Sequence, residues 1–417
     1  METKIKVLVL GDDLRSHSGV ANQLRYIVNG LHDSGKFSFI YLGGAIQHKD
    51  YRPVKFEQYG DDLILYPVDG YGNPDIVRSV LRTEKPDILL FMTDPRFYEW
   101  LFSIENEIRP NVPMVYYNIW DAPPAPTFNK KWYESCDLLV AISKLTDKLV
   151  KEVSPNVDRV RIPHAVDNKV FQKLPGNWKE QLFPDFKDKF ILFFNSRNAR
   201  RKMTGSLIYW FKKFLDKVGY DKATLIMHTN PFDPNGPNLN EIVKNWGLDN
   251  GQVLFSTESL SPLQLAQMYN AVDLSVLLSH SEGFGLMANE SLACGTPILV
   301  TMTGGLQEQV TDGKKWFGKG IRPVARPLVG SQDVPWIFED IVDEKSVVSA
   351  LEELYKTWKT KPEKYNKMGL SGQKHIHKNY NFDKFKEKWV DVMLKCYENN
   401  GSWETRKNYK PWELKEV

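Results

Sequence analysis

Apolar and polar residues along the first half of the chain form alternating blocks of two kinds. Short apolar runs of strand length occupy residues 4–10, 37–42, 87–92, 114–119 and 138–142. After the first run, apolar residues recur at helical spacing over 20–31, in a segment entered from Ser18 and Gly19. Strands that alternate with helices indicate parallel β-α-β units, so this half is predicted to be a doubly wound α/β domain.

A second series of the same kind follows a stretch that breaks the pattern. Residues 163–186 contain three prolines and a glycine, which predicts an interdomain linker. Further strand-like runs lie at 189–195, 223–228, 253–256, 274–278 and 296–301, with helical spacing over 206–218. From Ser346 onward the pattern is helical, with Trp358, Trp389, Trp403 and Trp412 between many lysines and glutamates.

The two series predict an α/β protein of two Rossmann-like domains that face a central cleft. The N-terminal domain is expected to cover 1–170 and the C-terminal domain 187–380. A helical segment at 381–417 could pack back on the N-terminal domain. The length of 417 residues agrees with more than one hydrophobic core. In such sheets, ligands bind beyond the carboxyl ends of the strands.

Composition narrows the class of protein without naming a ligand. The first apolar run has only about six residues, against the ~20 that a membrane span needs, so no transmembrane segment is expected. The three cysteines, Cys136, Cys294 and Cys396, are far apart and odd in number, which predicts a reducing, cytoplasmic setting without a disulfide framework or zinc site. A net charge of +3 neither requires nor excludes an anionic partner.

The strongest motif is the string SEGFGLMANESLACGTP at 281–297, where a strand runs into a glycine-bearing loop that opens a helix. The start of a helix offers free backbone N–H groups and a positive dipole end, which suit a diphosphate. Gly283 and Gly285 allow the backbone to approach a ligand closely. Glu290 would lie on the second turn, within reach of a ribose, and Glu282 at the loop entrance. An isolated pair of glutamates at this spacing would more often be two surface charges.

A second motif, NSRNARRK at 195–202, follows the first strand of the second series. Two cations just past a strand end are suited to neutralise a departing diphosphate, although a basic surface loop has the same composition. A third feature is the turn at 16–20, where Gly19 opens the first helix. Ser18 also fits a simple helix-capping role.

Together these motifs resemble the signature of glycosyltransferase family 4 in the GT-B superfamily, most specifically between residues 190 and 312. The matching positions are Glu282 and Glu290 in the E-x7-E element, Gly283 to Leu286 in the GFGL core, Ala293, Gly295 and Pro297 in the tail, Gly304, Gly305 and Glu308 in the GG-x-x-E turn, Arg197 with Lys202, and Gly19.

The resemblance implies a GT-B enzyme that transfers a sugar from a nucleotide-diphosphate donor with retention of configuration, without a metal or other cofactor. The catalytic residues that it implies are Glu282, Arg197, Lys202 and Asp121. The donor-binding residues that it implies are Gly19, Arg197, Lys202, Gly283, Phe284, Gly285, Leu286 and Glu290.

The sequence departs from the family pattern at two places. Family members often carry a His-Asp-like pair after a middle strand of the N-terminal domain, and here Trp120 precedes Asp121. The histidine that contacts the donor sugar in relatives is therefore replaced. In the hinge-like segment PHAVD at 163–167, Ala165 stands where the family has glycine, so this position should not need a positive φ.

The acceptor stays open: a glycan, a lipid, a small molecule or a hydroxylated base in phage DNA all fit. A DNA acceptor would need a basic track, to which Lys384, Lys386, Lys388, Arg200 and Arg201 could contribute, although a solvated face explains these charges more simply. A GT-B epimerase or phosphorylase is the main alternative activity. A catalytically inactive scaffold is disfavoured because the charged donor residues are intact.

Overall fold

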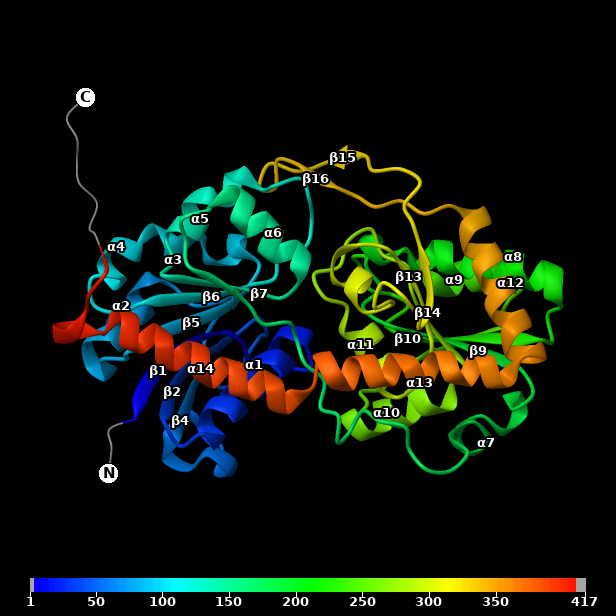
Figure 1. Ribbon diagram of the computed structural model, residues 1–417, viewed down its shortest axis with the longest axis horizontal. Helices are drawn as coiled ribbons and strands as arrows, with labels where there is room; N and C mark the ends of the chain where they lie inside the picture. The colour runs from blue at the N-terminus through cyan, green and yellow to red at the C-terminus, as the bar shows by residue number, and fades with distance from the viewer. Residues whose placement is uncertain (1–3, 410–417) are drawn as a thin grey trace. The chain divides into compact units, whose positions relative to one another are not determined.

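The computed structural model describes residues 4–409, which form two compact units (Figure 1). Within the described chain, unit 1 contains residues 4–165, 330–335 and 382–409. Unit 2 contains residues 166–329 and 336–381. The division within the 163–186 stretch therefore falls after Ala165, and the residues that follow it pack on unit 2. None of the helices between residues 4 and 409 is both long and apolar enough to cross a membrane.

Unit 1 is built on an eight-stranded sheet in the order β3-β4-β2-β1-β5-β6-β7-β8. Its strands are parallel except for the edge strand β3. They are β1 (Ile5–Asp12), β2 (Phe37–Gly44), β3 (Val54–Lys55), β4 (Leu63–Pro67), β5 (Ile88–Thr93), β6 (Met114–Asn118), β7 (Leu138–Ala141) and β8 (Arg159–Arg161). In register, Val7 of β1 pairs with Phe39 on one side and Ile88 on the other. The strand order reverses between β1 and β5, which places a topological switch point there.

Helices cover both faces of this sheet. They are α1 (Gly19–Asp33), α2 (Pro74–Glu84), α3 (Glu99–Ser103), α4 (Glu105–Ile108), α5 (Lys130–Glu134), α6 (Lys144–Val153) and α14 (Phe382–Asn400). Leu8 and Leu10 of β1 belong to a buried apolar cluster shared with α2 to α6. Successive side chains of a strand point to opposite faces, so Gly11 faces away from this cluster, where a Cβ would collide with Leu24 of α1.

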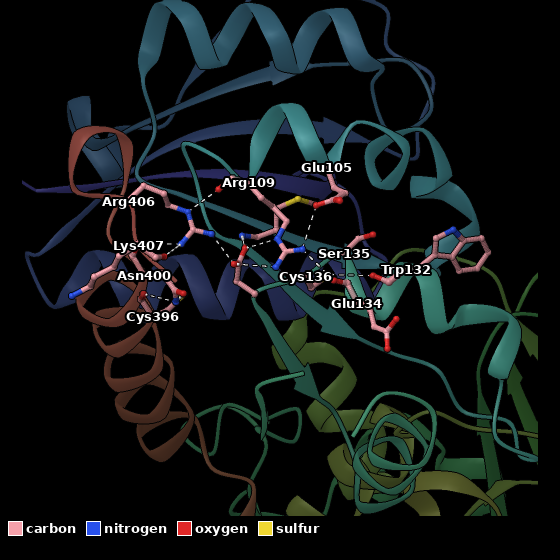
Figure 2. A network of polar contacts seen from close by, with 12 residues as sticks. Glu105, Arg109, Trp132, Glu134, Ser135, Cys136, Cys396, Asn400, Arg406 and Lys407 are labelled. Carbon is pink, nitrogen blue, oxygen red and sulfur yellow. Dashed lines mark hydrogen bonds and ion pairs between the residues drawn. The ribbon is translucent and has the colours of Figure 1, made fainter. Parts of the chain in front are cut away.

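The C-terminal segment is fastened to unit 1 at two places. α14 packs along α1, where the Tyr26 and Phe382 rings lie 4.7 Å apart and Lys386 pairs with Asp33. Beyond α14, the guanidinium of Arg406 donates to Asp137 at 2.7 Å in a pair whose side chains are both 4% exposed. It also donates to the Arg109 carbonyl at 2.7 Å (Figure 2). Arg109 bonds to the same carboxylate, so one buried acceptor holds both arginines.

Unit 2 is built on a six-stranded, wholly parallel sheet in the order β11-β10-β9-β12-β13-β14. Its strands are β9 (Phe190–Asn195), β10 (Ala223–His228), β11 (Val253–Ser256), β12 (Leu274–Leu277), β13 (Ile298–Thr301) and β14 (Gly318–Ile321). A separate hairpin pairs β15 (Leu328–Val329) with β16 (Ile337–Phe338). The sheet order reverses between β9 and β12, which is the switch point of this unit.

The helices of unit 2 enclose the sheet in the same way. They are α7 (Trp178–Leu182), α8 (Thr204–Val218), α9 (Leu239–Asn245), α10 (Pro262–Ala271), α11 (Leu286–Ala293), α12 (Glu344–Thr360) and α13 (Pro362–Asn379). Short 3-10 turns include η2 (Pro95–Tyr98) in unit 1 and η5 (Arg200–Lys202) and η6 (Gly304–Glu308) in unit 2.

The structure confirms the predicted α/β class of two doubly wound halves. The runs expected at 223–228 and 253–256 coincide with β10 and β11, and other predicted strands differ mainly at their ends. Strands β4, β8 and β14 were not among the predicted runs. β14 has no apolar run that would mark it as a strand, because glycines occupy two of its four positions. These glycines let β14 lie close to β13: a Cβ on Gly318 would lie 1.8 Å from the Ile298 carbonyl oxygen.

Candidate functional site

Two loops that leave adjacent strands form the core of the candidate site in unit 2. One loop follows β9 and leads through η5 into α8, and the other follows β12 and leads into α11. Because β9 and β12 flank the switch point of a parallel sheet, the region beyond their carboxyl ends, here called the crevice, is where such sheets bind ligands. The two strongest sequence motifs lie on these loops.

The two loops are joined by a buried ion pair. Lys202 of η5 donates from Nζ to Oε1 of Glu282, and the two side chains are 8% and 7% exposed. Ser279 donates to the same carboxylate oxygen at 2.8 Å. Arg201 contributes a second cation 3.5 Å from Glu282 and donates to the Ser281 carbonyl at 2.7 Å. Burial alone raises the pKa of Glu282, but Lys202 and Arg201 outweigh it, so the pKa is lowered and the carboxylate is ionised at neutral pH.

Arg197 is directed elsewhere. Its guanidinium binds Asp233, at 2.6 Å and 3.2 Å from the two carboxylate oxygens, and its side chain is 65% exposed. The hydrogen bonds from Arg197 lower the pKa of Asp233. The structure therefore brings Lys202 and Arg201 to Glu282. Arg197, the arginine expected from the motif, lies on the same loop after β9 but pairs with Asp233 of the loop after β10.

Two of the other basic residues considered for a nucleic-acid track, Arg200 and Lys386, are engaged in ion pairs. Arg200 binds Glu339 through two guanidinium nitrogens. Lys386 lies between Asp33 and Asp383 in unit 1. These contacts neutralise charges that a basic track for a nucleic-acid acceptor would use.

The second loop turns sharply into α11 because of its glycines. Gly285 is the N-cap of the helix and has φ 86°, a conformation that favours glycine. A Cβ on Gly304 would lie 1.6 Å from the Glu282 carbonyl oxygen, and one on Gly305 would lie 2.7 Å from Phe284 Cα. The glycine pair thus packs directly under the loop. The Ala288 N–H donates to the Gly285 carbonyl at 3.1 Å, so any N–H groups that the start of α11 offers to a ligand are those of Leu286 and Met287.

Two residues of the glycine-rich motif have opposite surroundings. Phe284 is only 3% exposed and packs against Tyr380, while its carbonyl accepts a hydrogen bond from Gln309 at 2.6 Å. Gly283 is partly exposed. Any contact of this segment with a ligand would therefore involve the backbone more than the Phe284 ring.

Glu290 lies on α11 and is held from the neighbouring helix α10. Tyr269, which is fully buried, donates its hydroxyl to Glu290 Oε2 at 2.9 Å. The same hydroxyl accepts a hydrogen bond from Asn195, the last residue of β9, at 3.0 Å. Burial raises the pKa of Glu290 to about 7, against the lowering effect of the Tyr269 hydrogen bond. The motifs do not identify Tyr269, because an aromatic residue on a helix normally indicates core packing.

Unit 1 presents a second polar cluster at its own switch point. Asp12 ends β1, is 5% exposed, and accepts hydrogen bonds from the hydroxyls of Ser18 and Tyr71. Burial, the largest effect, raises the pKa of Asp12. Ser18 also caps α1 as expected, by accepting from the Ala21 N–H at 3.0 Å. Gly19 follows as the first, exposed residue of the helix.

Asp121 and Trp120 follow β6 in unit 1. The Trp120 indole N–H donates to the Ala122 carbonyl at 2.8 Å, and the side chain is 7% exposed, so this tryptophan is occupied within its own loop. The hydrogen bond to Asp94 is the main reason that the pKa of Arg96 is raised, and the partly buried Asp121 adds a weaker attraction. As the alanine substitution implied, Ala165 is not among the described residues with positive φ.

Between residues 4 and 409, no group of three or more His, Cys, Asp or Glu side chains could hold a metal ion. The three cysteines, Cys136, Cys294 and Cys396, are buried and free.

Comparisons with known proteins agree with this geometry. Residues 178–321 match the family model described as glycosyl transferases group 1. A D-inositol 3-phosphate glycosyltransferase from Paenarthrobacter aurescens is 29% identical over 174 residues, which is 40% of this chain and 41% of that protein. The chain thus aligns with less than half the length of the curated relatives it matches.

Solved structures extend the similarity to both units. The sucrose-phosphate synthase of Thermosynechococcus elongatus matches with a TM-score of 0.74 at 15% identity, over 95% of this chain and all of that one. An Anabaena protein crystallised in complex with UDP-glucose matches with a TM-score of 0.70 at 16% identity, over 94% of this chain and 99% of that one. Residues 178–321 are therefore similar to the glycosyl transferases group 1 family, and the chain has a GT-B fold.

Proposed function

We propose that this protein is a retaining glycosyltransferase that moves a sugar from a nucleotide-diphosphate donor to an acceptor hydroxyl and needs no metal ion. The observation that carries the proposal is the Lys202–Glu282 ion pair, which lies beside Arg201 and the start of α11 at the switch point of unit 2. Fixed cations and helix N–H groups at one crevice suit a diphosphate.

In the proposed reaction, the bond between the anomeric carbon and the donor diphosphate breaks, and a bond to the acceptor oxygen forms on the same face of the sugar. The acceptor proton passes to the departing diphosphate. Lys202 and Arg201 would stabilise the negative charge that grows on this leaving group. Arg197 would join them only by leaving Asp233, a move that its exposed position permits.

The donor is proposed to lie along unit 2 with its ribose at Glu290 and its sugar near Glu282. The UDP-glucose bound by the structurally similar Anabaena protein supports a nucleotide-sugar donor. Retention is supported by the resemblance of the 281–297 string to family 4. The acceptor hydroxyl is proposed to bind at the polar edge of unit 1, which carries Asp12.

A donor screen followed by product analysis tests this proposal. UDP-, GDP- and ADP-sugars would first be compared by thermal shift, and the stabilising donor would then be incubated with candidate glycan, lipid, polyol and DNA acceptors. We expect free nucleoside diphosphate and a glycoside whose anomeric configuration, measured by proton NMR, equals that of the donor. An inverted product would refute retention, an altered sugar on an intact donor would indicate an epimerase, and a released sugar phosphate would indicate a phosphorylase.

A matched pair of lysine variants links the activity to the site. Lys202→Met removes the buried cation, whereas Lys212→Met removes a partly exposed lysine of α8 that pairs with Asp216 and lies over the Tyr220 ring. We expect turnover to fall by roughly 100-fold or more in the first variant, as when a charge-stabilising group is removed, and to stay within about twofold in the second. Equal activity of the two variants would contradict the proposed role of the crevice.

A further inference from the structure

A buried tyrosine connects the two loops of the candidate site from below. Tyr269 of α10 lies outside both sequence motifs. Its hydroxyl nevertheless lies between Asn195 at the end of β9 and Glu290 on α11. Its own backbone carbonyl is held by the Thr296 hydroxyl at 2.6 Å. The ring is fixed by packing against Phe193, with ring centroids 5.4 Å apart.

We propose that Tyr269 is a positioning residue that holds the Glu290 carboxylate in place for the hydroxyls of the donor ribose, with Asn195 orienting the Tyr269 hydroxyl. The inference rests on the proposed nucleotide-sugar transfer and adds a residue that the sequence motifs do not contain. Recognition of the ribose would then depend on the hydrogen-bonded chain of Asn195, Tyr269 and Glu290, and not on Glu290 alone.

The direction of the hydrogen bonds follows from the donors available. The Asn195 amide nitrogen can only donate, so it occupies a lone pair of the Tyr269 oxygen. The Tyr269 proton is then directed to Glu290 Oε2. A carboxylate accepts several hydrogen bonds, so the ribose hydroxyls can bind the same group from the crevice.

The protonation state of Glu290 makes nucleotide affinity depend on pH, which can be measured. Burial raises the pKa of Glu290 to about 7, and the Tyr269 hydrogen bond acts in the opposite direction. The titratable groups coupled to Glu290 in the described chain are Tyr269 from α10 and the buried thiol of Cys294 on α11 itself. Ribose hydroxyls donate to the ionised form, so nucleotide affinity should rise with pH through about 7.

The test compares Tyr269→Phe with Tyr365→Phe, which removes the hydroxyl of another buried tyrosine in unit 2 that bonds to the Asp273 carbonyl. Calorimetric titrations would use UDP, GDP and ADP between pH 6 and 9, and their 2′,3′-dideoxy forms. For the best-bound diphosphate, we expect Tyr269→Phe to lose roughly tenfold affinity at pH 7 and to shift the midpoint of the pH profile upward. Tyr365→Phe should match the unchanged protein.

The dideoxy nucleotides separate positioning from general damage to the fold. We expect them to bind weakly and equally to the unchanged protein and to Tyr269→Phe, with the same pH profile for both proteins. An equal loss for ribose and dideoxy forms, or an unshifted pH profile, would overturn the role of Tyr269. Should Tyr269→Phe fail to fold, Asn195→Ala must reproduce the same ribose-dependent loss for the inference to stand.

The proposed function fails in a different way. If none of the nucleoside diphosphates binds the unchanged protein, donor binding itself is refuted, and the Tyr269 inference falls with it. If the unchanged protein binds ribose and dideoxy forms equally well, nucleotide binding is confirmed, but Glu290 and Tyr269 do not recognise the ribose hydroxyls.

Discussion

Lys202 and Glu282 come from different loops and meet as an ion pair that is almost wholly enclosed by unit 2. Burying two charges is costly, and their attraction offsets that cost only while both partners are present. The pair therefore joins the loop after β9 to the loop after β12, and it fixes the Lys202 ammonium group beside the start of α11.

The first prediction is that removing either partner destabilises the protein more than removing both. Lys202→Met or Glu282→Gln should each lower the free energy of unfolding by about 3 kcal/mol, because one buried charge or its hydrogen bonds are left without a partner. The double variant should recover part of this loss. Urea unfolding of the four proteins measures the coupling, and strictly additive losses would show that the two side chains do not depend on each other.

The second prediction concerns the glycine pair under the loop. Gly304 and Gly313 both have positive φ, at 47° and 89°, but only Gly304 lies against the Glu282 carbonyl, whereas a Cβ on Gly313 would meet nothing within 4 Å. Gly313→Ala should cost about 1 kcal/mol of stability from the backbone alone. Gly304→Ala should cost at least about 3 kcal/mol and abolish nucleotide binding, because the loop must move. Similar melting temperatures for the two variants would argue against this packing.

The fold was predictable because its central strands are buried on both faces. Runs such as FILFF in β9 are apolar throughout, and the helices between them have clear periodicity. β14 carries two glycines and a lysine at the sheet edge, so it is recognisable only from its pairing with β13. The hairpin of β15 and β16 is too short to have a pattern of its own.

The motifs of the candidate site could be predicted from the sequence, but which of their side chains form ion pairs and hydrogen bonds with one another could not. Arg200, Arg201 and Lys202 are consecutive, yet the 3-10 turn directs them to Glu339, the Ser281 carbonyl and Glu282, respectively. Only the path of the loop decides which cation meets which carboxylate. The family pattern therefore selected Arg197, which the structure pairs with Asp233. It gave no indication of the contact between Tyr269 and Glu290.

The third prediction is a pH dependence of stability that belongs to Glu290. Its pKa is raised from 4.5 to about 7 in the folded protein. Between these values the folded protein holds a proton that the unfolded chain has released, so the stability from this group is complete below pH 4.5 and is lost as pH rises through about 7. Compared with Glu290→Gln, the unchanged protein should lose about 2–3 kcal/mol over this range. Unfolding curves of both proteins at pH 5 and 8 measure the difference, and parallel pH profiles would show that Glu290 is already ionised at pH 5.

The fourth prediction separates the acceptor from the donor. Asp12 of unit 1 accepts hydrogen bonds from Ser18 and Tyr71 at the end of β1. Asp12→Asn should raise the acceptor KM by roughly tenfold, the effect of one hydrogen bond to a charged group, and leave nucleotide affinity unchanged. Asp50→Asn, at an exposed carboxylate paired with Arg52, is the control. A rise in donor KM without a change for the acceptor would place Asp12 on the wrong substrate.

The last prediction is that turnover needs no divalent metal ion. The sequence has no Asp-x-Asp triplet of the kind that holds a metal beside a nucleotide diphosphate, and hard cations such as Mg²⁺ need carboxylate oxygens together with phosphate. At the crevice, the carboxylate of Glu282 is already bound by Lys202 and lies close to Arg201. These two cations and the dipole of α11 supply positive charge where a metal would act, so an added ion would meet repulsion. Activity after chelation and gel filtration should stay within about twofold of the untreated protein. If it disappears and returns with Mn²⁺ or Mg²⁺, Lys202 and Arg201 are not sufficient to stabilise the departing diphosphate, and the proposed mechanism is wrong.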